Sequence, residues 1–415
     1  MHPGRLVVIG AMVIGAQAAG GQPAARACRA TPLGQVKIKL DGDKQVFVEP
    51  QAVAASGDRV LVAGNPTYTF AWDAAHAMSF SRDSIFGIIL LPDGRATSIP
   101  SPQPPGRVHS VRAVAHSEGQ WAVVFAEAAP PPKFAAPVKV EAYWFGITDG
   151  ARWLSLEKLP LVEGDYMTER ASSIVKTERG YAFSVVVRAP VGDRAAVYSQ
   201  RDGRWSVALV GDGANYTSLA TDGRALMLAV VYADTMARGR TFAWRDANSL
   251  WLHRTADDGL TWGPAAWLVR GLGQAVHHPQ LMWSGRRLEV GWMSETPTDG
   301  YQIRIAALAT GDTLSSVTQL AGGTQQITSS FTSHGRPLWL SVDMVEGRAS
   351  IAWLHVWTMT GGAATEVVGI PTPFDGVAGY TVLGSSVIVV GPMRGANALE
   401  APVSLDIQQF PLNCD

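Results

Sequence analysis

A recurring hairpin pattern constrains the fold of this chain more than any other feature. Each copy opens with a short strand-like run, turns at a glycine and continues through a strongly apolar run. A variable loop and a second hairpin follow, so each unit supplies four strands. The units repeat roughly every 45–60 residues, the period expected of blades with loop insertions. Their turn glycines are Gly57, Gly119, Gly180, Gly223, Gly285, Gly335 and Gly384.

The second hairpin of several units carries Asp-Gly followed by a tryptophan. The fullest copy is Thr255 to Trp262, T-A-D-D-G-L-T-W. Asp-Gly suits a two-residue hairpin because both central positions can adopt positive φ. We therefore predict an all-β propeller of four-stranded blades, seven by unit count, with six as the alternative. The weaker copies are Asp149-Gly150 with Trp153, Asp202-Gly203 with Trp205, and Asp93-Gly94 without the tryptophan.

The two ends of the chain are predicted to meet. Val36 to Leu40 has no hairpin partner nearby, and as the outer strand of the last blade it would close the ring and hide both sheet edges. Cys28 and Cys414 are the two cysteines. In an oxidising compartment we expect a disulfide between them that locks this closure. Two free thiols, or a lipid-modified Cys28, are the alternatives.

The first residues have the pattern of an export signal. One positive charge in Met1 to Arg5 precedes an apolar run, Leu6 to Ala16, that is too short to span a bilayer. Small residues at Ala16 and Ala18 give a cleavage site. We predict a signal peptide over 1–18, with cleavage as late as 27 as the alternative, and one propeller domain over 28–415. The mature protein is expected to be secreted or periplasmic, without a membrane-spanning segment.

Composition and motifs exclude several functional classes. The net charge is −1, from 34 basic and 35 acidic residues, whereas nucleic acid would favour a basic excess. The sequence lacks the H-E-x-x-H spacing of zinc enzymes, the G-x-S-x-G nucleophile elbow and a phosphate-binding glycine loop. We therefore predict no metal, no cofactor and no nucleic-acid partner. His277 and His278 precede the fifth unit, without the spacing of a metal site.

The T-A-D-D-G-L-T-W stretch matches S/T-x-D-x-G-x-T-W, the Asp-box of sialidase-type propellers. The fixed positions are held by Thr255, Asp257, Gly259, Thr261 and Trp262. The chain therefore resembles the sialidase superfamily, whose members have six blades. The resemblance implies that the box is structural and lies at the third hairpin turn, away from the substrate face.

The resemblance also bears on catalysis. Sialidases carry an arginine in an F/Y-R-I-P motif, but the matching stretch, Phe47 to Pro50, has Val48 at that position. An apolar side chain cannot bind a carboxylate, which argues against sialidase activity unless Arg82 substitutes. Asp83, near Asp73, is the candidate acid. Tyr380 is the candidate nucleophile and Glu295 its base. The alternative is that the acids are ordinary loop carboxylates and that Tyr380 is a core residue.

Polar residues close the apolar second strands and form a candidate binding set. Glu127, Arg188 and Asp343, like Asn65, lie eight residues after their turn glycine. Glu295 lies ten after, which parity places on the same strand face, and Asp234 lies eleven after. Second strands of a propeller end where the ligand loops gather, so these residues are expected to surround the channel mouth. The alternative is that these strands simply end in polar residues at the protein surface.

Three hypotheses for function follow. The first is a secreted, sialidase-like propeller that binds a glycan or an extracellular protein, without assigned catalysis. The alternative is a glycoside hydrolase, exo-sialidase-like or other, that uses carboxylates at the channel mouth. A structural or assembly role is the third.

Overall fold

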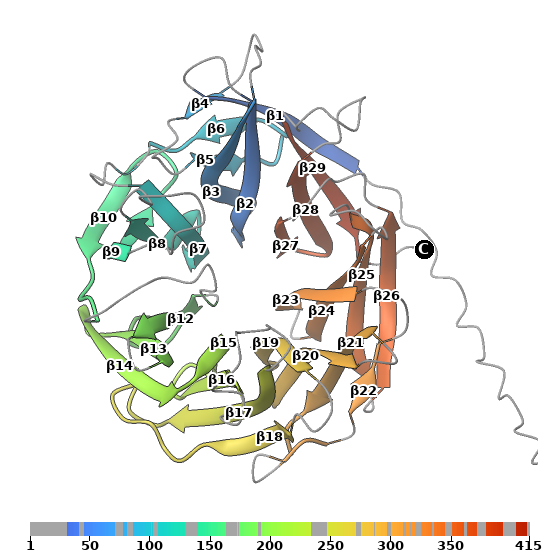
Figure 1. Cartoon of the computed structure of the whole chain (residues 1–415). Helices are drawn as coiled ribbons and strands as arrows, with labels where there is room; N and C mark the ends of the chain where they lie inside the picture. The colour runs from blue at the N-terminus through green and yellow to red at the C-terminus, as the bar shows by residue number, and fades with distance from the viewer. Residues whose placement is uncertain are drawn as a thin grey trace, which may run out of the picture.

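The computed structural model describes residues 31–40, 45–70, 78–80, 86–100, 102, 107–128, 140–162, 172, 174–189, 192–233, 247–270, 275–285, 287–296, 300–309, 313–315, 317–320, 325–333, 336–344, 351–360, 363–371, 379–392 and 404–412. Within them, seven sheets form a ring around a central axis, and the colour runs once round it from blue to red (Figure 1). The predicted all-β propeller is confirmed, with seven blades. No described helix is long and apolar enough to cross a membrane.

Blades 1 to 3 hold four antiparallel strands each, in order outward from the axis. Blade 1 contains β2 (Gln45–Ser56), β3 (Arg59–Phe70), β5 (Phe86–Leu90) and β6 (Ala96–Ser98). Blade 2 contains β7 (Arg107–Ser117), β8 (Gln120–Ala128), β9 (Val140–Thr148) and β10 (Trp153–Lys158). Blade 3 contains β11 (Val175–Lys176), β12 (Tyr181–Ala189), β13 (Gly192–Arg201) and β14 (Arg204–Asp212).

Blades 4 to 6 repeat this arrangement. Blade 4 contains β15 (Ala214–Thr221), β16 (Leu226–Ala233), β17 (Ala247–Thr255) and β18 (Ala266–Arg270). Blade 5 contains β19 (Ala275–Trp283), β20 (Leu288–Thr296), β21 (Gly300–Ala307) and β22 (Thr318–Gln319). Blade 6 contains β23 (Gln325–Ser333), β24 (Arg336–Met344), β25 (Ile351–Thr360) and β26 (Ala363–Pro371).

Blade 7 closes the ring with strands from both ends of the described chain. It contains β27 (Gly379–Leu383), β28 (Ser386–Pro392), β29 (Ser404–Pro411) and, as its fourth strand, β1 (Thr31–Leu40). β1 pairs antiparallel with β29, from Thr31 opposite Gln409 to Lys37 opposite Ser404. β4 (Met78–Phe80) adds a parallel fifth strand. The predicted closure by Val36 to Leu40 is confirmed, whereas Cys28, Cys414 and the signal-peptide residues lie outside the described residues.

The core lies between the blades, because each apolar second strand is buried on both faces. In β8, for example, Val123 belongs to the hydrophobic cluster shared with blade 1. Its neighbour Val124 belongs to the cluster shared with blade 3. Side chains alternate across a strand, so a continuous apolar run fills both inter-blade spaces. This explains the valine- and alanine-rich runs of the repeat.

The two ends of the ring differ in their connections. At one end the second strand of each blade ends and the third begins, as where β8 ends at Ala128 and β9 begins at Val140. We call this end the long-loop face. The opposite end, the hairpin face, has tight turns, and Gly119 and Gly203 adopt positive φ there. Glycine accepts such a conformation without a Cβ penalty.

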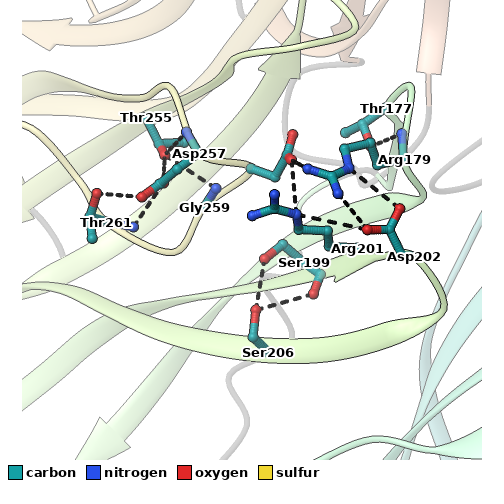
Figure 2. Close-up of polar contacts among 11 residues, drawn as sticks. Thr177, Arg179, Ser199, Arg201, Asp202, Ser206, Thr255, Asp257, Gly259 and Thr261 are labelled. Carbon is teal, nitrogen blue, oxygen red and sulfur yellow. Dashed lines mark hydrogen bonds and ion pairs between the residues drawn. The ribbon is translucent and has the colours of Figure 1, made fainter.

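The Asp-box forms a hydrogen-bonded turn at the hairpin face, between β17 and β18 (Figure 2). The Asp257 carboxylate accepts hydrogen bonds from the Thr255 hydroxyl at 2.5 Å and from the Thr261 backbone and hydroxyl at 2.9 and 2.5 Å. Burial opposes ionisation, but these bonds outweigh it and lower the pKa of Asp257 to about 2. Because Thr261 is held by the turn, β18 begins only at Ala266.

A set of charged turns joins blades 3 and 4 near this box. Arg179 pairs with Asp202 and lies 3.5 Å, Nη1 to Oδ2, from Asp258. Arg201 Nε lies 3.9 Å from Asp258 and 4.0 Å from Asp202. Figure 2 shows the labelled members, Arg179, Arg201 and Asp202, converging from two turns of blade 3. We call Arg179, Arg201, Asp202 and Asp258 the inter-blade clamp; its two positive and two negative charges balance.

Candidate ligand-binding site

Four residues of the predicted binding set occupy one register at the long-loop face. Glu127, Arg188, Glu295 and Asp343 are each the penultimate residue of their blade's second strand. Asn65 lies inside the longer β3 instead. Asp234, which follows β16, lies outside the described residues, as do Asp73, Arg82 and Asp83. The number of residues after each turn glycine therefore predicts correctly where these four second strands end.

The expectation that these side chains share one face was wrong for Glu295. Glu127 alternates with Trp121 and Phe125, which pack toward the preceding blade. Asp343 likewise shares the face of β24 that carries Trp339. Glu295 shares the face of Glu289, which bonds Trp339 of the following blade. The place of the glycine in its turn explains the difference, because Gly119 directly precedes Gln120, which pairs with Ser117, whereas Gly285 lies two residues before Arg287, whose carbonyl accepts a bond from the Ser284 N–H.

Glu295 and Asp343 consequently face the same space, the junction between blades 5 and 6. At the hairpin face this junction is closed by the buried Glu289, which accepts bonds from Arg287 at 2.9 Å and from Trp339 Nε1 at 3.1 Å. Its middle is apolar and includes Ile303 and Ile305 of blade 5 and Trp357 of blade 6. Its long-loop end holds the carboxylates of Glu295 and Asp343. We call that end the carboxylate junction.

A histidine held between two acids forms the blade 6 wall of the carboxylate junction. His355 on β25 donates through Nδ1 to Glu366 Oε1 at 2.6 Å and through Nε2 to Asp343 Oδ2 at 3.2 Å. Burial lowers the pKa of His355, but the hydrogen bonds to Asp343 and Glu366 outweigh it and raise this pKa to about 9. Both ring nitrogens can donate only in the imidazolium, so His355 is positively charged at neutral pH.

An exposed aromatic ring lies on the same wall. Trp353 stands directly opposite Asp343 in the ladder between β24 and β25. Its ring stacks on that of His355 at 6.3 Å and 21°, and the ring of Trp357 lies 5.9 Å from His355 on the same strand. Trp353 is 41% exposed, whereas Trp357 is buried. The stack therefore fixes a flat apolar ring at the edge of an acidic cluster.

The blade 5 wall carries a second acid and histidine pair. Glu295 Oε2 lies 3.8 Å from Nε2 of the buried His277 on β19. The next residue, His278, adopts a positive φ of 45° at a bulge in this strand and contacts the ring of Tyr216 at 4.6 Å. Such a backbone is uncommon outside glycine and is typical of bulges and of strained functional sites.

Two carboxylate oxygens at the carboxylate junction have no hydrogen-bond partner in the described part of the chain. They are Glu295 Oε2 and Asp343 Oδ1, and both are buried atoms. A buried polar atom without a partner destabilises the fold by about 1–3 kcal/mol, so it needs an explanation. Carboxylate oxygens accept hydrogen bonds, so a ligand that completes this site must bring donors.

Two other nominated residues, Glu127 and Tyr380, are held by contacts within the fold, whereas nothing is described of the Arg188 side chain. Glu127 is 3% exposed and accepts a hydrogen bond from Trp144 Nε1 at 2.9 Å within blade 2. Tyr380 on β27 packs into the apolar cluster between blades 6 and 7. Burial raises the pKa of Tyr380, which disfavours the phenolate that a nucleophile requires. Among the described residues, no group of three or more histidine, cysteine or acidic side chains is arranged to hold a metal ion.

Sequence reasoning missed Trp353, His355 and Glu366. Their signal was present in the alternation W-L-H-V-W, Trp353 to Trp357, which places two tryptophans and a histidine on one face of a strand. Glu366 has no comparable signal. Its contact with His355 depends on the register between β25 and β26, which includes a bulge.

No protein-family model matches the chain, and no curated protein is similar to it. Solved structures are similar in overall architecture at low identity. An α-L-arabinofuranosidase from Fusarium graminearum is 12% identical over 74% of this chain and 93% of its own, with a TM-score of 0.46. The β-propeller domain of a protease from Pyrococcus furiosus is 8% identical over 90% of this chain and 97% of its own, with a TM-score of 0.44. A sialidase from Trypanosoma rangeli is 11% identical over 88% of this chain and 53% of its own, with a TM-score of 0.47.

Proposed function

We propose that this chain is an exported, glycan-binding propeller whose ligand sits at the carboxylate junction. The exposed ring of Trp353 beside the fixed carboxylate of Asp343 carries the proposal. A sugar ring can pack its C–H face on an indole while its hydroxyls donate to carboxylate oxygens, and binding sites commonly combine such groups. The export pattern in residues 1–18 supports an activity outside the cytoplasm.

The charge of the carboxylate junction narrows the kind of glycan. Glu295, Asp343 and Glu366 supply three acids against the single charged histidine, His355. Even with His277 protonated, negative charge remains in excess. An anionic sugar such as sialic acid would be repelled, in agreement with Val48 at the position of the sialidase arginine. Neutral or basic sugars are the ligands that fit.

A glycoside hydrolase is the second candidate, because Glu295 and Asp343 face each other across one junction. Packed sheets lie about 10 Å apart, and side chains from facing walls shorten that separation. Inverting glycosidases hold their two carboxyl groups about 6.5–9.5 Å apart. The proximity of His277 to Glu295 and the bonding of Asp343 to His355 give the two acids different surroundings, which a general acid and base require.

A glycan array and a fluorogenic glycoside panel, run on the same variants, test both candidates. W353A should weaken binding of the recognised neutral or basic glycan at least about tenfold, equivalent to about 1.4 kcal/mol. The matched control is W267A, since Trp267 is an equally exposed tryptophan on blade 4 at 42%. Binding that is unchanged in W353A, or equally weakened in W267A, contradicts the proposed site. Hydrolysis that is lost in E295Q and D343N would establish the hydrolase.

A further inference from the structure

The opposite face of blade 5 presents hydrogen-bond donors instead of acids. Trp292 and Ser294 alternate with Glu295 on β20, so they face blade 4. Arg304 on β21 is the ladder partner of Trp292 and shares that face. Apolar residues of both blades, including Val231 and Ala306, surround this part of the junction. The three side chains thus form one polar patch in the blade 4–5 interface.

The donors of this patch are buried and unused. Trp292 is 1% exposed and Ser294 is 0% exposed. The indole Nε1, the serine Oγ and Arg304 Nε have no hydrogen-bond partner in the portion of the chain that the structure describes. An unmade bond to a buried donor destabilises the folded state, and more so when the donor is charged. Three such groups side by side call for a common partner.

The guanidinium of Arg304 also has no counter-charge among the described residues. Its η nitrogen donates to Gln302 Oε1 at 3.2 Å, a neutral acceptor, and no described acid lies within ion-pair distance. Arg287, on the opposite face of blade 5, instead pairs with Glu289 at 2.9 Å. A part-buried arginine without a carboxylate is costly unless an anion completes it.

We infer that Trp292, Ser294 and Arg304 form a binding site for a small anion, either chloride or a short carboxylate. All three groups can donate and one is positively charged, so an acceptor with negative charge satisfies the whole patch. Arg304 is part-exposed, and movement of its side chain gives the anion access to the two buried donors. This site lies on the face of blade 5 opposite to Glu295, and it is independent of the proposed glycan site.

Thermal unfolding of the full chain in sodium chloride tests the inference. Sodium gluconate, a salt of a bulky anion, replaces chloride at constant ionic strength, and sodium acetate forms a parallel arm. The native protein should show a saturable rise in its unfolding midpoint with chloride or acetate, as expected when a ligand binds only the folded state. R304Q should abolish this rise and W292F should shift it to higher anion concentration. R224Q, a change of an exposed arginine on a hairpin of blade 4, should retain it.

Bromide-soaked crystals supply a second measurement. An anomalous peak beside the Trp292 indole nitrogen supports the site, and its loss when acetate competes distinguishes the two anion classes. If R304Q does not fold, W292F and S294A keep the test decisive because they remove single donors. The absence of an anion-specific rise in the native protein would overturn the inference. So would an unchanged rise in W292F and S294A, or a water molecule alone at the donors.

Discussion

The inter-blade clamp and the carboxylate junction both gather acids between neighbouring blades, yet they are built in opposite ways. In the clamp, two arginines face two aspartates at the hairpin face. At the junction, at the long-loop face, Asp343 and Glu366 share the charged His355, Glu295 lies beside His277, and two carboxylate oxygens have no hydrogen-bond partner among the described residues. Charge is balanced in the first region and in excess in the second.

Under the proposed function, this difference separates a structural cluster from a ligand-binding one. A balanced cluster satisfies its own members and needs nothing from solvent. An excess of acid stabilises nothing by itself, because like charges repel and unpaired oxygens are desolvated. Such an arrangement persists where a ligand or a reaction uses it. The three predictions below test whether the two clusters respond as this distinction requires, beginning with the largest effect.

Removing the charged histidine should destabilise the carboxylate junction most. H355Q leaves Asp343 and Glu366 facing each other without a cation. A pKa raised from 6.5 to about 9 corresponds to about 3 kcal/mol of stability. Because the folded-state pKa is raised, this contribution is complete below pH 6.5 and is lost as the pH rises from 6.5 through about 9. Urea unfolding at pH 6 and pH 9.5 should show this loss in the native protein.

The same measurement on H355Q should show a much flatter profile between pH 6.5 and 9. H253Q is the matched control, because burial lowers the pKa of His253 and its charge therefore contributes nothing in that window. A native profile that H355Q leaves unchanged would remove the basis for treating His355 as the cation of the junction.

Substitution of the Asp-box carboxylate should have an intermediate effect. D257A removes the acceptor of bonds from Thr255 and Thr261 and should reduce stability at pH 7 by about 2 kcal/mol. Since the pKa of Asp257 is lowered to about 2, its contribution is present above pH 4 and is lost as the pH falls toward 2. Native protein and D257A should therefore converge in acid unfolding experiments. A difference that persists at pH 2 would contradict this assignment.

Breaking the inter-blade clamp should have the smallest effect. R179M removes one arginine of a solvent-accessible network and should cost about 1 kcal/mol or less, with a smaller difference in high salt. R224Q, which breaks an isolated exposed pair with Glu178, should change stability less still. If R179M proves more damaging than H355Q, the distinction between balanced and unbalanced clusters fails.

Much of the fold follows from local sequence. The turn glycines and apolar runs identify all seven blades, because each hairpin is encoded by neighbouring residues. Val36 to Leu40 was recognisable as the closing strand because it lacked a local partner. The ends of the second strands were also predictable, and Glu127, Glu295 and Asp343 lie at that register.

The candidate site was less predictable, for two physical reasons. The face on which Glu295 lies depends on the place of the glycine within its turn, so counting from Gly285 gave the right strand end and the wrong face. The contact between His355 and Glu366 depends on strand register across a bulge, which no short motif encodes. Side chains brought together by non-local pairing leave only compositional traces in the sequence.

The pairing of Thr31 with Gln409 has a consequence for biogenesis. The first strand to emerge during synthesis finds its sheet only after nearly every other strand has been made, so ring completion is a late and slow step. Until then its edge is available to other chains, and a binding chaperone would have most to protect at that stage. Moving residues 31–40 to follow β29 would turn this distant pairing into a simple hairpin and should speed refolding without altering the finished ring.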